Sequence, residues 1–367
     1  MQQNTINIQG KDYTLDFSRF YLNNAEKYLN ASKSNKNREE EYLKKAEELI
    51  HRSKIASFTS QENINAVNDF TLKKKPTTKF SDVAGLEELK ERIKLKVIEP
   101  LKNPELFKLF GKKFGGGILM YGPPGCGKSF IAEATAGEAK VHYFNVKASD
   151  IKGKYVGETE QNITRLFKIA RENQPCIIFF DEFEALGRER NDAVGHDKAM
   201  VSQLLTEIDS VGNKNQQIMV LAATNEPWSI DLALRREGRF GNTLFVPPPD
   251  LEGRATILKN NLKDKPLEDD FDFEFLAKIT DLYSGADLIE VCNTAIENVL
   301  SHCLEKKAIR KITTDDLLKV IHKKKELITL SWFRKALEII HLNNNQDSFN
   351  ELIEYTSKIG KNEALVY

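Results

Sequence analysis

A glycine-rich segment of eight residues constrains the fold of this chain more than any other feature of its sequence. Gly122–Ser129, which reads GPPGCGKS, follows the apolar run Gly117–Tyr121 and precedes the helical pattern of Phe130–Ala139. In such a strand–loop–helix arrangement, glycines let successive backbone N–H groups surround phosphate oxygens, and the helix N-terminus adds positive charge. Lys128 can reach the β- and γ-phosphates, and the Ser129 hydroxyl can bind Mg²⁺. The sequence therefore predicts a site for ATP or GTP with Mg²⁺.

Apolar runs alternate with helical patterns on both sides of this prediction. Several runs are continuously apolar, as expected for parallel strands that helices cover on both faces. We predict an α/β fold with a doubly wound parallel sheet and a P-loop core. The expected strands are Gly117–Tyr121, His142–Val146, Cys176–Phe180, Met219–Thr224 and Thr243–Val246.

The character of the sequence changes along the chain and divides it into five parts. Residues 1–70 are polar, with apolar residues at helical spacing, which predicts an N-terminal helical bundle; the family resemblance described below implies that this bundle binds substrate or adaptor. A basic linker at 71–79 leads to the large α/β subdomain at 80–262. From there the sequence is helical, which predicts a lid at 263–326 and a C-terminal helical hairpin at 327–367.

Composition restricts the setting in which the protein works. Lys+Arg and Asp+Glu both number 54, and the pI is about 7.0, so net charge gives no support to nucleic-acid binding. We expect no direct membrane insertion, because no apolar run approaches about 18 residues and the N-terminus shows no signal pattern. The cysteines have no metal-like spacing, which favours a reducing compartment and a cytoplasmic location. They are Cys126, Cys176, Cys292 and Cys303.

Polar residues follow two of the predicted strands. Cys176–Phe180 is followed by Asp181, which could hold the Mg²⁺ shell, and by Glu182, which could polarise an attacking water. Asn225 ends a later strand and can hydrogen-bond the water or the γ-phosphate. Further along, Arg235–Phe240 contains arginines, whose guanidinium groups suit phosphate. The alternative interpretations are a solvated acidic pair and a basic surface turn.

Taken together, these motifs resemble the AAA family of P-loop ATPases, over about two-thirds of the chain. The similar branch contains the Cdc48/p97 unfoldase, proteasomal ATPases, katanin and the ESCRT-disassembling ATPase Vps4. Besides the phosphate loop, the matching segments are Asp82–Leu86, Gly153–Thr159, Phe180–Glu182, Ala223–Asn225, Arg235–Phe240 and Ser284–Leu288.

The resemblance implies roles for individual residues. Asn225 would sense the γ-phosphate, and Arg236 and Arg239 would reach the nucleotide of a neighbouring subunit in a homo-oligomeric ring, usually a hexamer. Asp209 falls where the family signals between subunits. Mg²⁺ would be held at Ser129 and Asp181. The implied ATP-binding residues are Val83, Ala84, Pro124, Gly125, Cys126, Gly127, Lys128, Ser129, Phe130, Ile257, Gly285 and Ala286.

Four positions depart from the family's usual pattern. Asn261 stands where several relatives have a lid histidine near adenine, and Lys198–Ala199 stands where an arginine pair is common. Phe183–Glu184 replaces the Ile-Asp that often follows the acidic pair. Cys126 stands where Thr is common, and a thiol at a helix N-terminus can have a lowered pKa and be open to oxidation. The plainer interpretation of Cys126 is a small residue that fits.

The resemblance also indicates a use for the ATP. Tyr155 and Val156 match a loop that lines the central pore of the ring, where an aromatic side chain grips an unfolded polypeptide by sequence-tolerant contact. Gly195–His196 would belong to a second pore loop. We therefore expect an ATP-driven, ring-forming motor that unfolds or disassembles proteins by threading. Ordinary packing is the other explanation for an aromatic residue at position 155.

Alternatives remain open at this stage. Vps4-like disassembly of ESCRT-III-type filaments is suggested by Pro227–Trp228 and by Tyr42–Leu49, which resembles the third helix of a microtubule-interacting-and-transport domain. A tetratricopeptide-like hairpin or a plain amphipathic hairpin would fit the N-terminal helices equally well. A nucleotide-dependent scaffold with little turnover and a nucleic-acid remodeller are the other candidates. The C-terminal hairpin, with helices at Ser331–Ile340 and Phe349–Tyr355, is expected to pack on the lid or on the next subunit.

Overall fold

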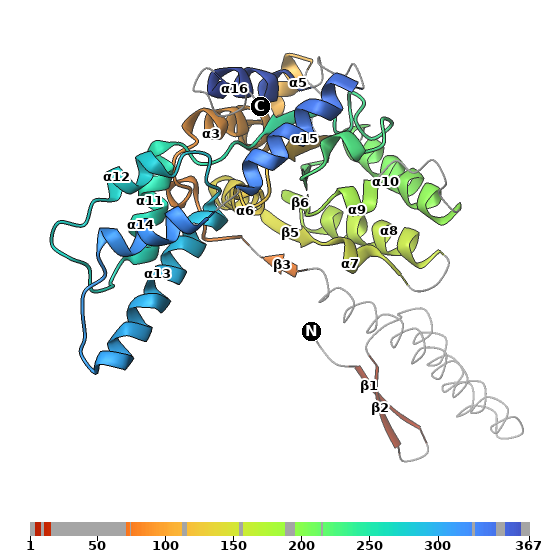
Figure 1. Ribbon diagram of the computed structural model, residues 1–367. Coiled ribbons are helices and arrows are strands. Elements are labelled where there is room, and N and C mark those ends of the chain that lie inside the picture. Colours follow the sequence, from red (N-terminus) through yellow and green to blue (C-terminus); the bar gives the residue numbers. More distant parts are fainter. Residues whose placement is uncertain are drawn as a thin grey trace, which may run out of the picture. The chain divides into compact units, whose positions relative to one another are not determined.

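The computed structural model describes residues 4–8, 11–15, 71–73, 75–111, 116–153, 157–187, 195–213, 216–324, 327–342 and 349–360 (Figure 1). The chain divides into two compact units, Met1–Phe70 and Thr71–Tyr367. In the first unit, β1 (Asn4–Ile8) pairs antiparallel with β2 (Lys11–Leu15). This hairpin was not among our predictions, and the predicted helices of 16–70 lie outside the described residues.

The second unit is built on a sheet of six strands in the order β3-β5-β6-β7-β4-β8. The five strands from β4 to β8 are parallel, which confirms the doubly wound α/β fold. Three of them have the predicted bounds, and the other two differ by one residue at one or both ends. They are β4 (Gly117–Tyr121), β5 (His142–Val146), β6 (Cys176–Phe180), β7 (Ile218–Thr224) and β8 (Asn242–Phe245).

The sixth strand lies inside the segment expected to be a linker. Thr71–Lys73 forms β3, which pairs antiparallel with β5 at the edge of the sheet. Residue 71 is opposite Asn145, and residue 73 is opposite Tyr143. The chain therefore enters the ATPase unit through a strand of the sheet itself.

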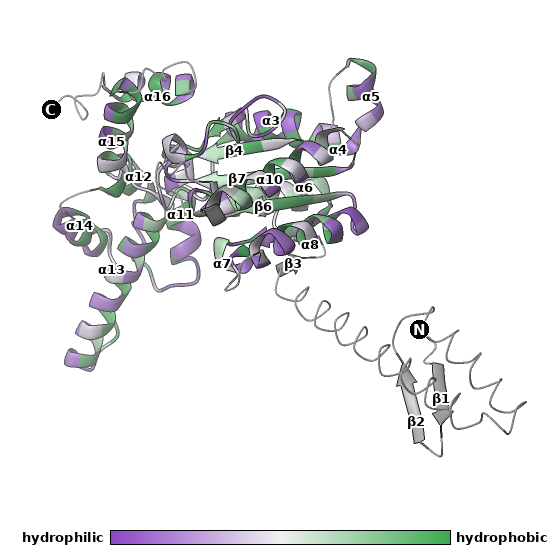
Figure 2. Ribbon diagram, turned by 90° about the vertical axis from the view of Figure 1, so that its right-hand side faces the viewer, coloured by the Kyte–Doolittle hydropathy of each residue, from purple (hydrophilic) through white to green (hydrophobic). Residues whose placement is uncertain are grey.

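Helices cover both faces of the sheet, and Figure 2 shows strands β4, β6 and β7 as hydrophobic ribbons between them. Phe179 packs in a buried cluster with Ile93 and Ile131 on one face. Its neighbour Phe180 points to the other face, where its ring lies 6.5 Å from that of Phe167. The α-helices of this subdomain are α3 (Glu87–Ile93), α4 (Glu99–Lys102), α5 (Pro104–Leu109), α6 (Lys128–Ala139), α7 (Ala148–Ile151), α8 (Glu158–Glu172), α9 (Glu184–Gly187) and α10 (Gly195–Asn213). Shorter helical turns are η2 (Phe80–Asp82), η3 (Lys94–Ile98, π-helical) and η4 (Pro227–Ser229).

The lid is a helical layer with a hydrophobic core of its own. Ser284 and Thr313 cap its two C-terminal helices, and each forms a capping box with an aspartate three residues on. The buried cluster of the lid includes Leu258 and Leu262, which the sequence boundary placed in the α/β subdomain. By packing, the lid therefore begins with α11. Its helices are α11 (Leu251–Leu262), α12 (Phe273–Ile279), α13 (Gly285–Lys306) and α14 (Thr314–Lys323).

The C-terminal hairpin consists of α15 (Ile328–Leu342) and α16 (Asn350–Gly360). It packs on the end of the sheet of its own chain, where Tyr121 and Phe245 join a buried cluster with Phe333 and Phe349. Leu282, at the base of the lid, belongs to the same cluster. The hairpin thus touches the lid, as expected, but its larger partner is the α/β sheet. No helix among the described residues is both long and apolar enough to cross a bilayer.

Candidate nucleotide-binding site

The glycine-rich loop connects β4 to α6 and leads directly into the helix N-terminus. Gly125 and Gly127 have φ values of 75° and 80°, a left-handed conformation that glycine adopts without strain. A Cβ atom on Gly125 would lie 2.8 Å from Ser284 Oγ and 2.9 Å from Ala286 Cβ. The Ala286 N–H also donates to the Gly125 carbonyl, at 3.2 Å. Glycine is therefore required at position 125 both by the backbone and by the close approach of the lid.

Lys128 is the first residue of α6, and its side chain turns back onto the loop. Its ammonium group donates to the carbonyls of Gly122, at 2.9 Å, and Pro123, at 2.8 Å. Burial lowers the pKa of Lys128 to about 8, because a charged ammonium is disfavoured away from water. A phosphate group in the loop would offer this buried cation a partner of opposite charge.

Ser129 and Asp181 meet although they come from different elements. The Ser129 hydroxyl donates to Asp181 Oδ2 over 2.8 Å, which joins the start of α6 to the end of β6. A hydroxyl and a carboxylate are hard oxygen ligands that fit Mg²⁺, which in nucleotide sites takes one or two protein ligands plus phosphate oxygens. The pair is thus suited to a magnesium ion carried by a nucleotide.

Glu182 follows Asp181 with an unusual backbone. Its φ of 49° is left-handed, and its N–H donates to the carboxylate of Asp181 over 3.0 Å. Left-handed conformations of non-glycine residues are strained, and such strain is concentrated at functional sites. The side chain of Glu182 lines the cavity described next.

A cavity of about 680 Å³ gathers these groups between the large subdomain and the lid. This volume is in the range of small-ligand sites, about 300–1,000 Å³. Every residue that the resemblance assigned to ATP or Mg²⁺ lines it, as do Glu182 and Asn225. Asn261, at the variant lid position, also lines the cavity and donates to the carbonyl of Ile257 over 2.8 Å.

Asn225, which lines this cavity, carries a polar atom without a hydrogen-bond partner among the described residues. Its side-chain oxygen is buried and has no hydrogen-bond partner in the described part of the chain. Most buried polar atoms are paired, so an unpaired one indicates a ligand or an unplaced water. The position of Asn225 after β7 is the one that the sequence predicted.

Sequence reasoning missed several lining residues. Leu86, Pro249, Asn260 and Ile289 also face the cavity. Ile289 lies one helical turn beyond Gly285, and helical spacing could have identified it. Leu86 and Pro249 lie in irregular segments, where spacing gives no such signal.

Of the two interpretations of Cys126, its burial favours the small residue that fits. Burial raises the pKa of Cys126 to about 12, and only 7% of the residue is exposed. The nearby Lys128 lowers this pKa, but less than burial raises it. The thiol therefore stays protonated, and the small-residue interpretation holds.

The two arginines lie away from the cavity of their own chain. Arg236 is exposed, and Arg239 forms a two-pronged ion pair with Asp209, with both Nε–Oδ1 and Nη2–Oδ2 distances at 2.8 Å. The Asp209 hydrogen bonds raise the pKa of Arg239, and the same bonds lower the pKa of the Asp209 carboxyl. Neither arginine lines the nucleotide cavity.

The structure describes only part of the two predicted pore loops. Tyr155 and Val156 lie outside the described residues. Gly195 and His196 form the start of α10.

The parallel sheet, the glycine-rich loop and the carboxylates at the end of the adjoining strand define a P-loop ATPase. Residues 118–248 match the family model described as "ATPase family associated with various cellular activities (AAA)". Over 269 residues, the chain is 37% identical to the "Putative cell division cycle ATPase" of Plasmodium falciparum (isolate 3D7). That alignment covers 72% of this chain but only 22% of the relative's length. Residues 118–248 therefore form an AAA ATPase domain.

Proposed function

We propose that this chain is a ring-forming motor that uses ATP to unfold or disassemble proteins in the cytoplasm. One observation carries the proposal: Ser129, Asp181, Glu182 and Asn225 converge on one cavity, whereas Arg236 and Arg239 lie outside it. Such a chain holds a nucleotide alone but takes its arginines from a neighbour. A homo-hexamer, the usual ring of the family it resembles, would bring them together.

Each residue has a defined task in this proposal. The loop N–H groups and Lys128 bind the phosphates, and Ser129 and Asp181 orient the metal. Mg²⁺ bound with ATP neutralises charge on the β- and γ-phosphates. Glu182 accepts the proton of the attacking water, and Asn225 hydrogen-bonds the γ-phosphate.

The arginines complete the site from the next subunit. A guanidinium group from a neighbouring subunit stabilises the charge on the transferred phosphoryl group in the transition state. In P-loop NTPases it accelerates hydrolysis by a factor of about 10³–10⁵. Turnover per protomer should therefore depend on assembly. Polypeptide threading by Tyr155 and Val156 would use the conformational change that accompanies each cycle.

Filament disassembly is a second candidate, favoured by Trp228. This residue follows Asn225 in the Pro227–Trp228 pair shared with Vps4-like proteins, and its ring packs 5.7 Å from that of Trp332. In this proposal the N-terminal unit selects the substrate, either a protein to be unfolded or a filament to be disassembled. Binding of short helical tails to the intact 367-residue chain would favour filament disassembly.

The first test measures particle size and ATPase rate against protein concentration, with ATP and Mg²⁺. We expect rings of about six subunits, as is usual for the resembling branch, with turnover that rises steeply as they form. Glu182→Gln should retain ATP unhydrolysed in those rings, because binding groups remain while the base is lost. Glu172→Gln, which changes an exposed carboxylate at the end of α8, is the matched control.

A monomer whose turnover does not depend on concentration would contradict the ring and favour the scaffold alternative. Threading is tested separately with Tyr155→Ala, which should keep basal hydrolysis and lose unfolding of a tagged substrate. Undiminished unfolding by that variant would exclude the pore assignment.

A further inference from the structure

The first helix of the C-terminal hairpin lies over the turn that follows β7. The indole N–H of Trp332 donates to the backbone carbonyl of Asn225, with Nε1 and O separated by 2.7 Å. Trp332 is only 7% exposed, so water competes little for this bond. A helix more than a hundred residues away in sequence thus holds the peptide group of a cavity residue.

A second side chain of α15 holds the next residue of the same turn. Lys335 forms an ion pair with Glu226, with Nζ and Oε1 at 2.9 Å, and lies over the ring of Trp228. Trp332 and Lys335 are three residues apart, so they share one face of the helix. That face fixes the turn at two points, through a carbonyl and through a side chain.

The other side of the hairpin is anchored at the base of the lid. The Thr329 hydroxyl, fully buried one turn before Trp332, donates to the carbonyl of Leu282. Two residues later, Ser284 caps α13, whose Ala286 N–H bonds the phosphate loop. One helix therefore contacts both the lid segment that leads to the loop and the turn that carries Asn225.

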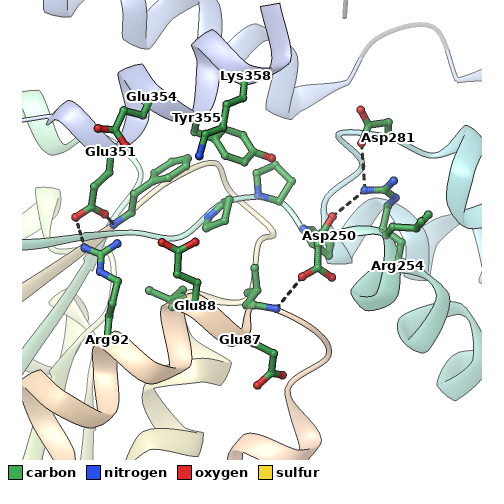
Figure 3. Close-up of a pocket in the computed structure, with 17 residues that line it drawn as sticks. Glu87, Glu88, Arg92, Asp250, Arg254, Asp281, Glu351, Glu354, Tyr355 and Lys358 are labelled. Carbon is green, nitrogen blue, oxygen red and sulfur yellow. Dashed lines mark hydrogen bonds and ion pairs between the residues drawn. The ribbon is translucent and has the colours of Figure 1, made fainter. Parts of the chain in front are cut away.

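The second helix of the hairpin, α16, makes further contacts with the rest of the chain, and Figure 3 shows the ion pair between Glu351 and Arg92. Glu351 pairs with Arg92 of α3, and its second oxygen accepts the N–H of Phe245 over 3.0 Å. The start of α16 is therefore bound to the sheet and to α3. These bonds and the contacts of α15 anchor the hairpin on the second unit.

The bond from Trp332 reaches Asn225 at its backbone. The carbonyl of Asn225 accepts the Trp332 N–H, and the side-chain oxygen of this cavity-lining residue is buried without a hydrogen-bond partner among the described residues. We infer that Trp332 is a positioning residue that holds the Asn225 amide toward the γ-phosphate and reports nucleotide state to the lid. This inference rests on the proposed role of Asn225 in ATP hydrolysis.

The test removes one hydrogen-bond donor and leaves the shape of the side chain. Replacing Trp332 with 3-benzothienylalanine exchanges the N–H for sulfur in an otherwise similar ring. We expect kcat to fall about tenfold, the effect of one lost positioning hydrogen bond, with KM and ATP affinity within about twofold. The same replacement at Trp228, whose indole has no hydrogen bond among the described residues, should leave kcat unchanged.

A double-mutant cycle separates positioning from general support. In an Asn225→Ala background, the Trp332 replacement should cause no further loss, because the group that it orients is gone. An equal loss in both backgrounds, or an unchanged kcat in the single variant, would overturn the inference.

Fluorescence gives a readout that does not depend on turnover. The chain has two tryptophans, so Trp228→Phe leaves Trp332 as the sole one. With Glu182→Gln to retain ATP, we expect its emission to differ between ATP and ADP, and Asn225→Ala to abolish the difference. Equal emission with both bound nucleotides would overturn the link. Failure of the proposed function is distinct, since the otherwise unmodified chain would then be a monomer whose turnover does not depend on concentration.

Discussion

The structure presents two cations that suit phosphate, and their surroundings differ in every respect. Lys128 is buried in the loop, bonded to backbone carbonyls, and its pKa is lowered to about 8. Arg239 is part-exposed, held by the carboxylate of Asp209, and its pKa is raised. Lys128 lines the nucleotide cavity of its own chain, whereas Arg239 lies outside that cavity. In the proposed ring, ATP binding would rest on residues of one chain, and hydrolysis would also need the arginines of a second chain.

The largest expected effect is at Lys128. Lys128→Ala removes the only charged group of the loop itself, so ATP binding should fall below detection in isothermal titration calorimetry, and turnover with it. Lys168→Ala, on the exposed side of α8, is the control and should bind ATP normally. If the Lys128 variant still bound ATP, the proposal that Lys128 is needed for ATP binding would be wrong.

Arg239→Ala should act on hydrolysis alone. Turnover should fall by about 10³-fold, the lower end of the range for a trans arginine, while the Kd for ATP changes little. Mixing this variant with Glu182→Gln should restore some activity, because a mixed ring contains intact pairs. Arg334→Ala, an exposed arginine of α15, serves as the control. A matching loss of ATP affinity would place Arg239 in the cavity of its own chain.

A smaller effect is expected at Asp209. Asp209→Asn removes the charge that holds Arg239, so turnover should fall about tenfold from the lost charge-assisted hydrogen bonds, with ATP binding intact. Asp315→Asn, which breaks a surface ion pair with Lys319, is the matched control. Unchanged turnover would show that Arg239 needs no such support.

The pKa of Lys128 predicts the smallest effect, on pH dependence. The protonated form binds phosphate, so ATP affinity should be lost as pH rises through about 8 and be about tenfold weaker at pH 9. The stability of the nucleotide-free protein changes with pH in the opposite direction to ATP affinity. Between about pH 8 and the ordinary lysine value of 10.5, the unfolded chain binds more protons, so this residue makes stability rise with pH. Affinity measured from pH 7 to 9 tests the first statement, and thermal unfolding without nucleotide tests the second.

Much of the fold follows from local sequence. The continuous apolar runs of β4 and β6 predicted their bounds, because parallel strands covered on both faces have few other patterns. The β1–β2 hairpin carried a signal that could have been used: alternating residues in Asn4–Ile8 and a two-residue connection ending in glycine. β3 has three residues, too few for any period to show.

The remaining features depend on contacts between distant segments. That α11 packs with the lid is decided by the partners of Leu258 and Leu262, not by their spacing. The raised pKa of Cys126 comes from burial that only the assembled cavity creates. The bond from Trp332 to Asn225 joins residues 107 apart, and the sequence of neither segment predicts it.

The left-handed backbone of Glu182 has a consequence for the engineering of this protein. At φ 49°, glycine or asparagine would relieve strain of about 1 kcal/mol. A library selected for thermal stability alone would therefore favour replacement of the residue on which hydrolysis is proposed to depend. Stability and activity conflict at this single position, so that a more heat-resistant variant altered there should be a slower motor.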